Sequence, residues 1–375
     1  MKKKKKNSSQ AWIGIVVTIV CLVAIFFFIE PAQIWAALKE ANYWYLLLTG
    51  LGLVLFLVIR AWRWRFMLEN DVPTLPIFHV QNIGYLVNAY LPLRLGDMTQ
   101  AVLIGNVPPV TIARGVSTVV MARIVDMTFM VILLLFTLTQ VETMPEQVQS
   151  TTRMFGGLVT AAIVLLAAAA NQRPFVRKRF TLILNWLTQV SHTAAQRLEQ
   201  KITHAERPLL YKPVHLLFSI LSHLDTQAWI HRIDDFLMGL NSLTHLKSSL
   251  ILITYTIFIW LPIIGAYYTG MLAVHLEPTI PMAAFAVCIA AFSVAAPSSP
   301  GQVGVFHAGV IFALYNILGQ PEAQAASFAF LYHAVMMMVT TLMGIISLWA
   351  TGATFRHVID TTRNYLNKKE AKRKI

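Results

Sequence analysis

The chain has 375 residues, of which 57% are apolar or aromatic and 13% are charged. A soluble globular domain carries roughly 25% charged residues, so the composition excludes a soluble protein and predicts an integral membrane protein. The 30 Lys and Arg residues outnumber the 17 Asp and Glu residues and give a net charge of +13. Taken alone, this charge fits a nucleic acid, an anionic membrane surface or an acidic substrate.

The N-terminus begins with a basic segment, residues 1–10, followed by an apolar stretch over residues 11–29. This stretch is longer than the roughly 7 to 15 residues of a signal-peptide core, and no clear cleavage site follows it. We therefore predict an uncleaved first span. The two cysteines, Cys21 and Cys288, lie inside apolar runs, which excludes a disulfide framework.

The apolar stretches predict an all-α membrane protein, because a bilayer core needs about 20 apolar residues per helix. Proline and glycine residues interrupt the stretch from 74 to 106, which we interpret as a re-entrant hairpin beside a polar central cavity. The eight candidate spans cover residues 11–29, 43–61, 116–140, 154–170, 249–272, 279–296, 303–318 and 325–350.

The distribution of Lys and Arg predicts the orientation of these spans. Basic residues collect on one side, which places both termini in the cytoplasm and the protein in the cytoplasmic, inner membrane. Anionic lipid headgroups account for these cations, so no nucleic-acid partner is expected. The predicted organisation is a basic N-terminus, two membrane halves around a cytoplasmic segment, and a basic tail, with bounds at 1–10, 11–170, 171–247, 248–350 and 351–375.

The segment 171–247 mixes apolar stripes with basic residues at helical spacing, which predicts helices that lie on the cytoplasmic interface. Its histidines have no close metal-ligand spacing, and we interpret them as scattered interfacial residues. They are His192, His204, His215, His223, His231 and His245.

A first group of polar residues lies in the sequence NAYLPLRLGD, from Asn88 to Asp97. Pro92 and Gly96 break the helix there, and a guanidinium such as that of Arg94 can grip a phosphate with two hydrogen bonds. The sequence fits either an anionic-headgroup site or a polar surface turn with a local ion pair.

A second group lies inside an apolar run, where Arg123 and Asp126 stand on one helix face at a spacing of three. A structural ion pair between helices and a polar cavity both explain them. The sequence RAWRWR at residues 60–65 is interpreted as an interfacial anchor.

A third group is the sequence APSSPGQVGVFHAGV. Its prolines end one helix, Ser298 and Ser299 offer hydroxyls, and Gly301 and Gly304 allow close backbone approach. The next helix would direct its first N–H groups at an occupant of this break. His307 follows on that helix, either as a hydrogen-bonding residue between helices or as a ligand group.

These motifs in their order resemble the transmembrane-region family of lysylphosphatidylglycerol synthases, also described as flippase-like membrane proteins. The matching blocks are RAWRWR, LPLRLGD, ARIVD, FLMGLNSL and SSPGQVG. The resemblance implies that a polar interior contains Arg94, Gly96, Asp97, Arg123, Asp126, Pro300, Gly301 and Gly304.

This chain departs from the family pattern at Ala122 and His307, where many members have glutamate, so a carboxylate relay is not expected. The chain ends shortly after its last predicted span, and we therefore do not expect the aminoacyl-transferring synthase domain that some members carry.

The sequence lacks a Walker A loop, a GxSxG elbow and a CxxC pair, so we expect neither an enzyme nor a bound cofactor or metal. The favoured hypothesis is a flippase or transporter for a phospholipid or lipid-linked substrate with a phosphate, anionic or polyprenyl in type. The alternative is a non-catalytic accessory subunit or a polytopic enzyme of lipid-linked envelope biosynthesis. Homo-oligomerisation stays open.

Overall fold

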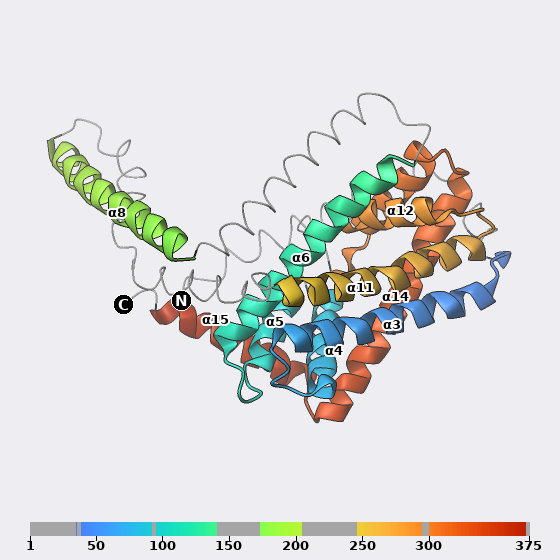
Figure 1. Ribbon diagram of the computed structural model, residues 1–375, viewed down its shortest axis with the longest axis horizontal. Coiled ribbons are helices and arrows are strands. Elements are labelled where there is room, and N and C mark those ends of the chain that lie inside the picture. Colours follow the sequence, from blue (N-terminus) through green and yellow to red (C-terminus); the bar gives the residue numbers. More distant parts are fainter. Residues whose placement is uncertain are drawn as a thin grey trace. The chain divides into compact units, whose positions relative to one another are not determined.

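The computed structural model describes residues 35, 39–91, 95–140, 173–204, 246–294 and 300–372. Within these ranges every regular element is a helix (Figure 1), which confirms the predicted all-α fold class. The chain divides into two compact units, one formed by Met1–Ala161 with Leu250–Ile375 and the other by Ala162–Ser249.

In the described part of the chain, four helices are long and apolar enough to cross a bilayer. They contain 25 to 30 residues, against a requirement of about 20. They confirm four of the eight predicted spans, while 11–29 and 154–170 lie outside the described residues. The four helices are α3 (Tyr43–Met67), α6 (Ile112–Leu138), α11 (Leu246–Ala273) and α14 (Glu322–Thr351).

At two of the predicted spans the helices are shorter than predicted, and neither reaches the length needed to cross a membrane alone. The first is α12 (Ile280–Ser293), whose 14 residues rise about 21 Å, against a bilayer core of about 30 Å. The predicted span 303–318 is instead a sequence of short pieces, in which α13 packs against α12. The pieces are η4 (Pro300–Gln302), α13 (Val305–Ile311) and the π-helix η5 (Phe312–Ile317).

The predicted hairpin at 74–106 consists of two helices that pack against each other, α4 (Thr74–Tyr90) and α5 (Leu95–Ile104). The two backbones approach so closely that a Cβ atom at Gly96 would lie 1.9 Å from the carbonyl oxygen of Gly84. A residue without a Cβ is therefore required at position 96. The depth of this hairpin in the membrane stays a prediction.

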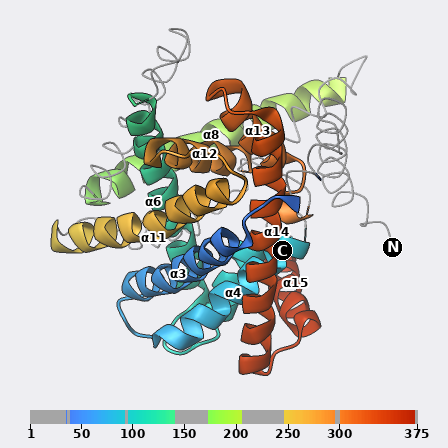
Figure 2. The same cartoon turned by 90° about the vertical axis from the view of Figure 1, so that its right-hand side faces the viewer.

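Helix α3 lies beside α11 in both ribbon views (Figures 1 and 2), and the two run antiparallel. Near the start of α3, Thr49 Oγ1 lies 2.9 Å from Thr269 Oγ1. Near its end, Arg63 Nη1 donates a 3.2 Å hydrogen bond to Thr256 Oγ1. These contacts between distant parts of the sequence fix which face of α3 points into the protein.

Helix α14 packs antiparallel to α4, the first helix of the hairpin, and this contact holds one side of the hairpin. His79 Nδ1 lies 3.1 Å from Ser347 Oγ, and Tyr90 Oη lies 3.0 Å from Thr341 Oγ1. The left-handed Gly352 (φ 65°) ends α14.

After this turn, α15 (Phe355–Lys372) packs against α5. Val358 of α15 is fully buried, and Thr362 Oγ1 donates to Thr99 Oγ1 at 3.3 Å. The hairpin is therefore held by α14 on one side and by α15 on the other.

The second unit contains one described helix of its own, α8 (Arg173–His204). Its presence agrees with the helical pattern predicted for 171–247. Residues 205–245 lie outside the described residues, and the interfacial location of this segment stays a prediction.

Candidate functional site

An ion-paired cluster joins α3 to α6 through the carboxylate of Asp126. Its Oδ2 accepts a 2.7 Å hydrogen bond from Arg60 Nη2, and its Oδ1 accepts one of 2.6 Å from Arg63 Nη1. The side chains of Asp126, Arg60 and Arg63 are 7%, 11% and 1% exposed. Because charges inside a membrane protein are costly when unpaired, this cluster links the two helices tightly.

The helical spacing of α3 explains why these arginines face inward. Positions 60 and 63 are one turn apart and share a face, whereas Trp62 between them is 47% exposed. One residue further on, Trp64 Nε1 donates a 3.0 Å hydrogen bond to Thr118 Oγ1 of α6. The end of α3 is therefore fixed against α6 by a tryptophan as well as by two arginines.

A second ion pair joins α6 to the α4–α5 hairpin. Arg123 donates from Nε to Asp97 Oδ2 at 3.1 Å and from Nη2 to Asp97 Oδ1 at 2.6 Å. Asn88 Nδ2 donates to the same carboxylate at 3.2 Å, while Asn88 Oδ1 accepts a 2.7 Å hydrogen bond from the Gly96 amide. The amide of Asn88 thus fixes Asp97 at the point where the chain enters α5.

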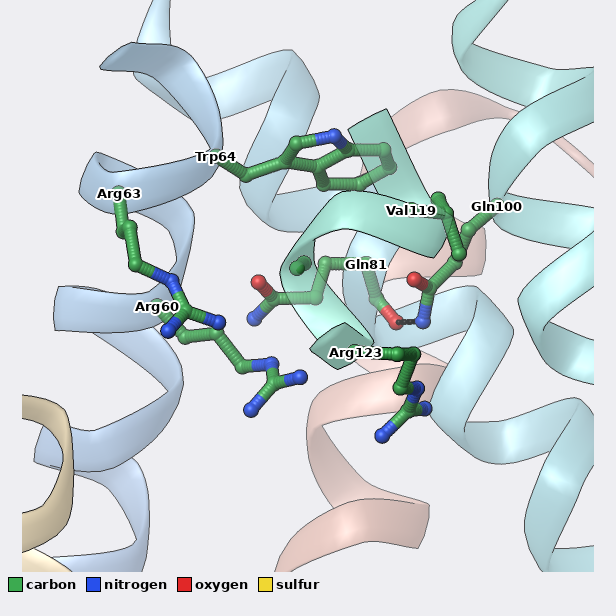
Figure 3. A pocket seen from close by; sticks show the side chains of 8 residues that line it. Arg60, Arg63, Trp64, Gln81, Gln100, Val119 and Arg123 are labelled. Carbon is green, nitrogen blue, oxygen red and sulfur yellow. Dashed lines mark hydrogen bonds between the residues drawn. The ribbon is translucent and has the colours of Figure 1, made fainter. Parts of the chain in front are cut away.

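A cavity of about 20 Å³ is lined by arginines of both ion-paired clusters (Figure 3), and this volume holds about one water molecule. Three arginines and two glutamines contribute to its wall, and none of the lining residues that the structure describes is acidic. We call it the arginine cavity, and its lining residues are Arg60, Arg63, Trp64, Gln81, Gln100, Val119, Ala122 and Arg123.

Hydrogen bonds hold the two glutamines in the wall. Gln81 Nε2 donates to the Leu57 carbonyl at 3.0 Å, and Gln100 Nε2 donates to the Gln81 carbonyl at 3.3 Å. The second of these bonds appears as the dashed line in Figure 3. These two hydrogen bonds connect α3, α4 and α5 and therefore hold the glutamine part of the cavity wall in place.

Arg63 has spare hydrogen-bonding capacity. Its Nη2 atom is buried and has no hydrogen-bond partner within the described ranges. Buried polar atoms are nearly always satisfied by protein, water or a ligand. Since the three guanidinium groups of Arg60, Arg63 and Arg123 meet two carboxylates, the described site keeps one uncompensated positive charge and is suited to an anion.

The C-terminal break forms a separate hydrogen-bonded cluster. Gly301 and Gly304 have positive φ angles of 69° and 84°. His333 Nε2 donates to the Gly301 carbonyl at 2.7 Å, and the Gly304 amide donates to His307 Nδ1 at 3.2 Å. His307 Nδ1 therefore accepts the hydrogen bond of an N–H group that was predicted to bind a ligand.

The structure unites some of the predicted site residues and separates others. Asn88, Asp97 and Arg123 form one cluster, and Asp126 belongs to the adjacent one. Gly301, Gly304 and His307 lie in the C-terminal cluster. The predicted residues that fall outside the described ranges are Arg94, Ser298 and Ser299.

Sequence reasoning missed Arg60, Arg63, Gln81 and Gln100. The interpretation of RAWRWR as an interfacial anchor is wrong for Arg63, because that side chain is buried and ion-paired. The sequence feature that indicates an inward role for Arg63 is Asp126, because a carboxylate inside an apolar run needs a basic partner from another helix.

The family model that describes the lysylphosphatidylglycerol synthase transmembrane region matches residues 11–344 of the chain. No curated protein and no solved structure matches. The family match includes all the residues of the arginine cavity and of both ion-paired clusters, and the family is related to lipid handling. The chain is therefore a multi-pass membrane protein that belongs to the lysylphosphatidylglycerol synthase transmembrane-region family.

Proposed function

We propose that this protein moves a phosphate-bearing lipid across the cytoplasmic membrane and that the arginine cavity binds the lipid headgroup. The observation that carries the proposal is a cavity wall with three arginines and, among its described residues, no acid, located among helices long and apolar enough to cross a membrane. Guanidinium groups bind phosphate through two parallel hydrogen bonds. The lipid tails would stay in the bilayer while the headgroup passes between α3, α6 and the hairpin.

The unpartnered Nη2 of Arg63 supports this assignment. Arg63 is held from its other terminal nitrogen by Asp126 and Thr256, so its position is set before a ligand arrives. A preorganised donor binds an anion without losing side-chain freedom at that step. In this proposal the protein is a carrier and not an enzyme, and both termini are cytoplasmic.

Replacing Arg123 with glutamine is expected to slow lipid movement at least about tenfold, because a charge-assisted hydrogen bond contributes about 1.5 to 3 kcal/mol. The measurement uses purified protein in vesicles that contain fluorescent phospholipids. Accessibility of the fluorophore to an external quencher reports the rate of movement between leaflets.

Arg114 offers a matched control on the same helix. Arg114 and Arg123 are 30% and 35% exposed, and each pairs with an aspartate, at 2.7 Å and 2.6 Å. Because Arg114 does not line the arginine cavity, Arg114→Gln is expected to leave the rate within about twofold of the original protein. Folded Arg123→Gln protein that moves lipid at the original rate would overturn the proposed function.

A further inference from the structure

The two carboxylates of the site differ in their accessibility. The Asp126 side chain is 7% exposed and its two arginine partners are 11% and 1% exposed. The Asp97 and Arg123 side chains are 24% and 35% exposed. An incoming ligand therefore meets the Arg123–Asp97 pair first, whereas the Asp126 cluster is more deeply buried.

Asp97 occupies the edge of Arg123 that would bind a phosphate. Both carboxylate oxygens accept hydrogen bonds from this edge, one from Nε and one from Nη2. A phosphate presents two oxygens to a guanidinium in the same manner. The Nε–Nη2 edge of Arg123 cannot hold both anions, so a phosphate that binds there must take the place of Asp97.

The size of the arginine cavity also requires a movement. Its volume of about 20 Å³ holds about one water molecule, and a phosphate group with four oxygens is larger. One wall residue must therefore shift when a headgroup enters. Arg123 lines the cavity and belongs to the more exposed ion pair, which makes it the wall residue that is easiest to release.

We propose that Asp97 is a built-in competitor for the lipid phosphate: it neutralises Arg123 when no lipid is bound, and the phosphate displaces it. This inference rests on the proposed function. Because Arg123 of α6 holds the first turn of α5 through Asp97, displacement of the carboxylate releases this link between the beginning of α5 and α6. Headgroup binding is thereby coupled to opening of the hairpin.

Replacing Asp97 with asparagine tests the competition, because asparagine keeps the shape of the side chain and removes its charge. The affinity of full-length protein in detergent is measured by thermophoresis with two probes, dihexanoylphosphatidylglycerol and inorganic phosphate. Asp97→Asn is expected to bind the lipid probe about tenfold more tightly, since a competing anion is removed. Tighter binding of both probes supports the proposal and identifies the phosphate as the shared determinant.

Asp71→Asn is the matched control, because Asp71 pairs with Arg114 at 2.7 Å and lies outside the arginine cavity. Its affinity for both probes is expected to equal that of the original protein. Unchanged or weaker lipid binding by folded Asp97→Asn protein overturns the proposal. Tighter binding of inorganic phosphate alone also overturns it, since the displacing group would then be a free anion.

A measurement on the unaltered protein covers the case in which Asp97→Asn does not fold. Hydrogen exchange of the backbone amides at 95–104 is followed with and without saturating dihexanoylphosphatidylglycerol. Release of Asp97 predicts faster exchange at the beginning of α5 when the lipid is present, and unchanged or slower exchange contradicts the release.

The outcomes for the two proposals are separable. If Asp97→Asn tightens lipid binding but Arg123→Gln moves lipid at the original rate, the competition stands and the transport function fails. If Arg123→Gln abolishes movement while Asp97→Asn leaves affinity unchanged, the transport function stands and the competition fails.

Discussion

Replacement of Asp126 by asparagine is expected to lower the free energy of unfolding by about 3 to 5 kcal/mol, because it leaves two buried guanidinium groups without a counter-charge. Arg60 and Arg63 both donate to this one carboxylate, and neither is more than 11% exposed. The change is measured by unfolding the purified protein with SDS in mixed micelles.

Asp71→Asn again provides the comparison, because Asp71 pairs with an arginine at a similar distance but its side chain is 38% exposed. An exposed ion pair contributes less than about 1 kcal/mol. If the two variants unfold at the same SDS concentration, the Asp126 cluster does not stabilise the helix contact.

Replacing all three members of the Asp126 cluster with apolar residues separates the effect of the cluster on lipid movement from its effect on stability. A buried charged cluster exchanged for apolar side chains of similar volume is often neutral or stabilising. We expect the triple variant Arg60→Met, Arg63→Met, Asp126→Leu to regain most of the stability that Asp126→Asn loses. Under the proposed function it still fails to move lipid.

Replacement of Gly96 by alanine is expected to cost about 1 to 3 kcal/mol, the range for overpacked sites. The added Cβ would lie 1.9 Å from the Gly84 carbonyl and 2.6 Å from Asn88 Oδ1. Because a backbone oxygen of α4 cannot rotate away, α5 must move. The variant is therefore expected to unfold earlier in SDS and to weaken the contact of Asn88 with Asp97.

Gly265→Ala is the control for this glycine substitution. Gly265 lies inside α11, and a Cβ there would meet nothing within 4 Å. Alanine favours a helix interior over glycine by about 0.5 to 1 kcal/mol, so this variant is expected to match or exceed the original stability. Equal behaviour of the two alanine variants would contradict the close approach of α4 and α5.

Hydropathy located the long helices well but misjudged some of their ends. The span predicted for 43–61 continues to Met67, because Arg63 finds a partner inside the protein and need not end the span. The predicted span 116–140 begins earlier, at Ile112, because the Thr111 side chain accepts a hydrogen bond from the Arg114 amide. In both places a specific polar contact determines the helix end, and hydropathy does not encode it.

The same limit explains why α12 and α13 are shorter than the spans predicted there. Residues 279–296 are apolar enough to span a membrane, yet α12 ends at Ser293. Proline cannot continue a helix, and Pro297 and Pro300 follow closely. Counting apolar residues adds those of the helix to the apolar residues that follow it in the sequence.

The sequence predicted some residues of the candidate site but not the pairs that they form. Arg123 and Asp126 stood out because charged residues are rare in an apolar run. Asp97 was predicted as well, but its pairing with Arg123 was not, because the two lie 26 positions apart. Arg63 was missed, because it lies 63 positions from Asp126. Local spacing suggested a relation between Arg123 and Asp126, whereas each pairs with a residue of another helix.

The long separation between Arg63 and Asp126 has a consequence for biosynthesis. Helix α3 leaves the ribosome before α6 is synthesised, since its arginine precedes the aspartate by 63 residues. An arginine at the centre of a span opposes insertion by about 2.5 to 3.5 kcal/mol, whereas Arg60 and Arg63 lie near the C-terminal end of α3, from which long side chains reach the headgroup region. We therefore expect the arginine-bearing end of α3 to lie among the lipid headgroups until α6 is inserted. On this expectation, the arginines of α3 contact lipid phosphates before they pair with Asp126.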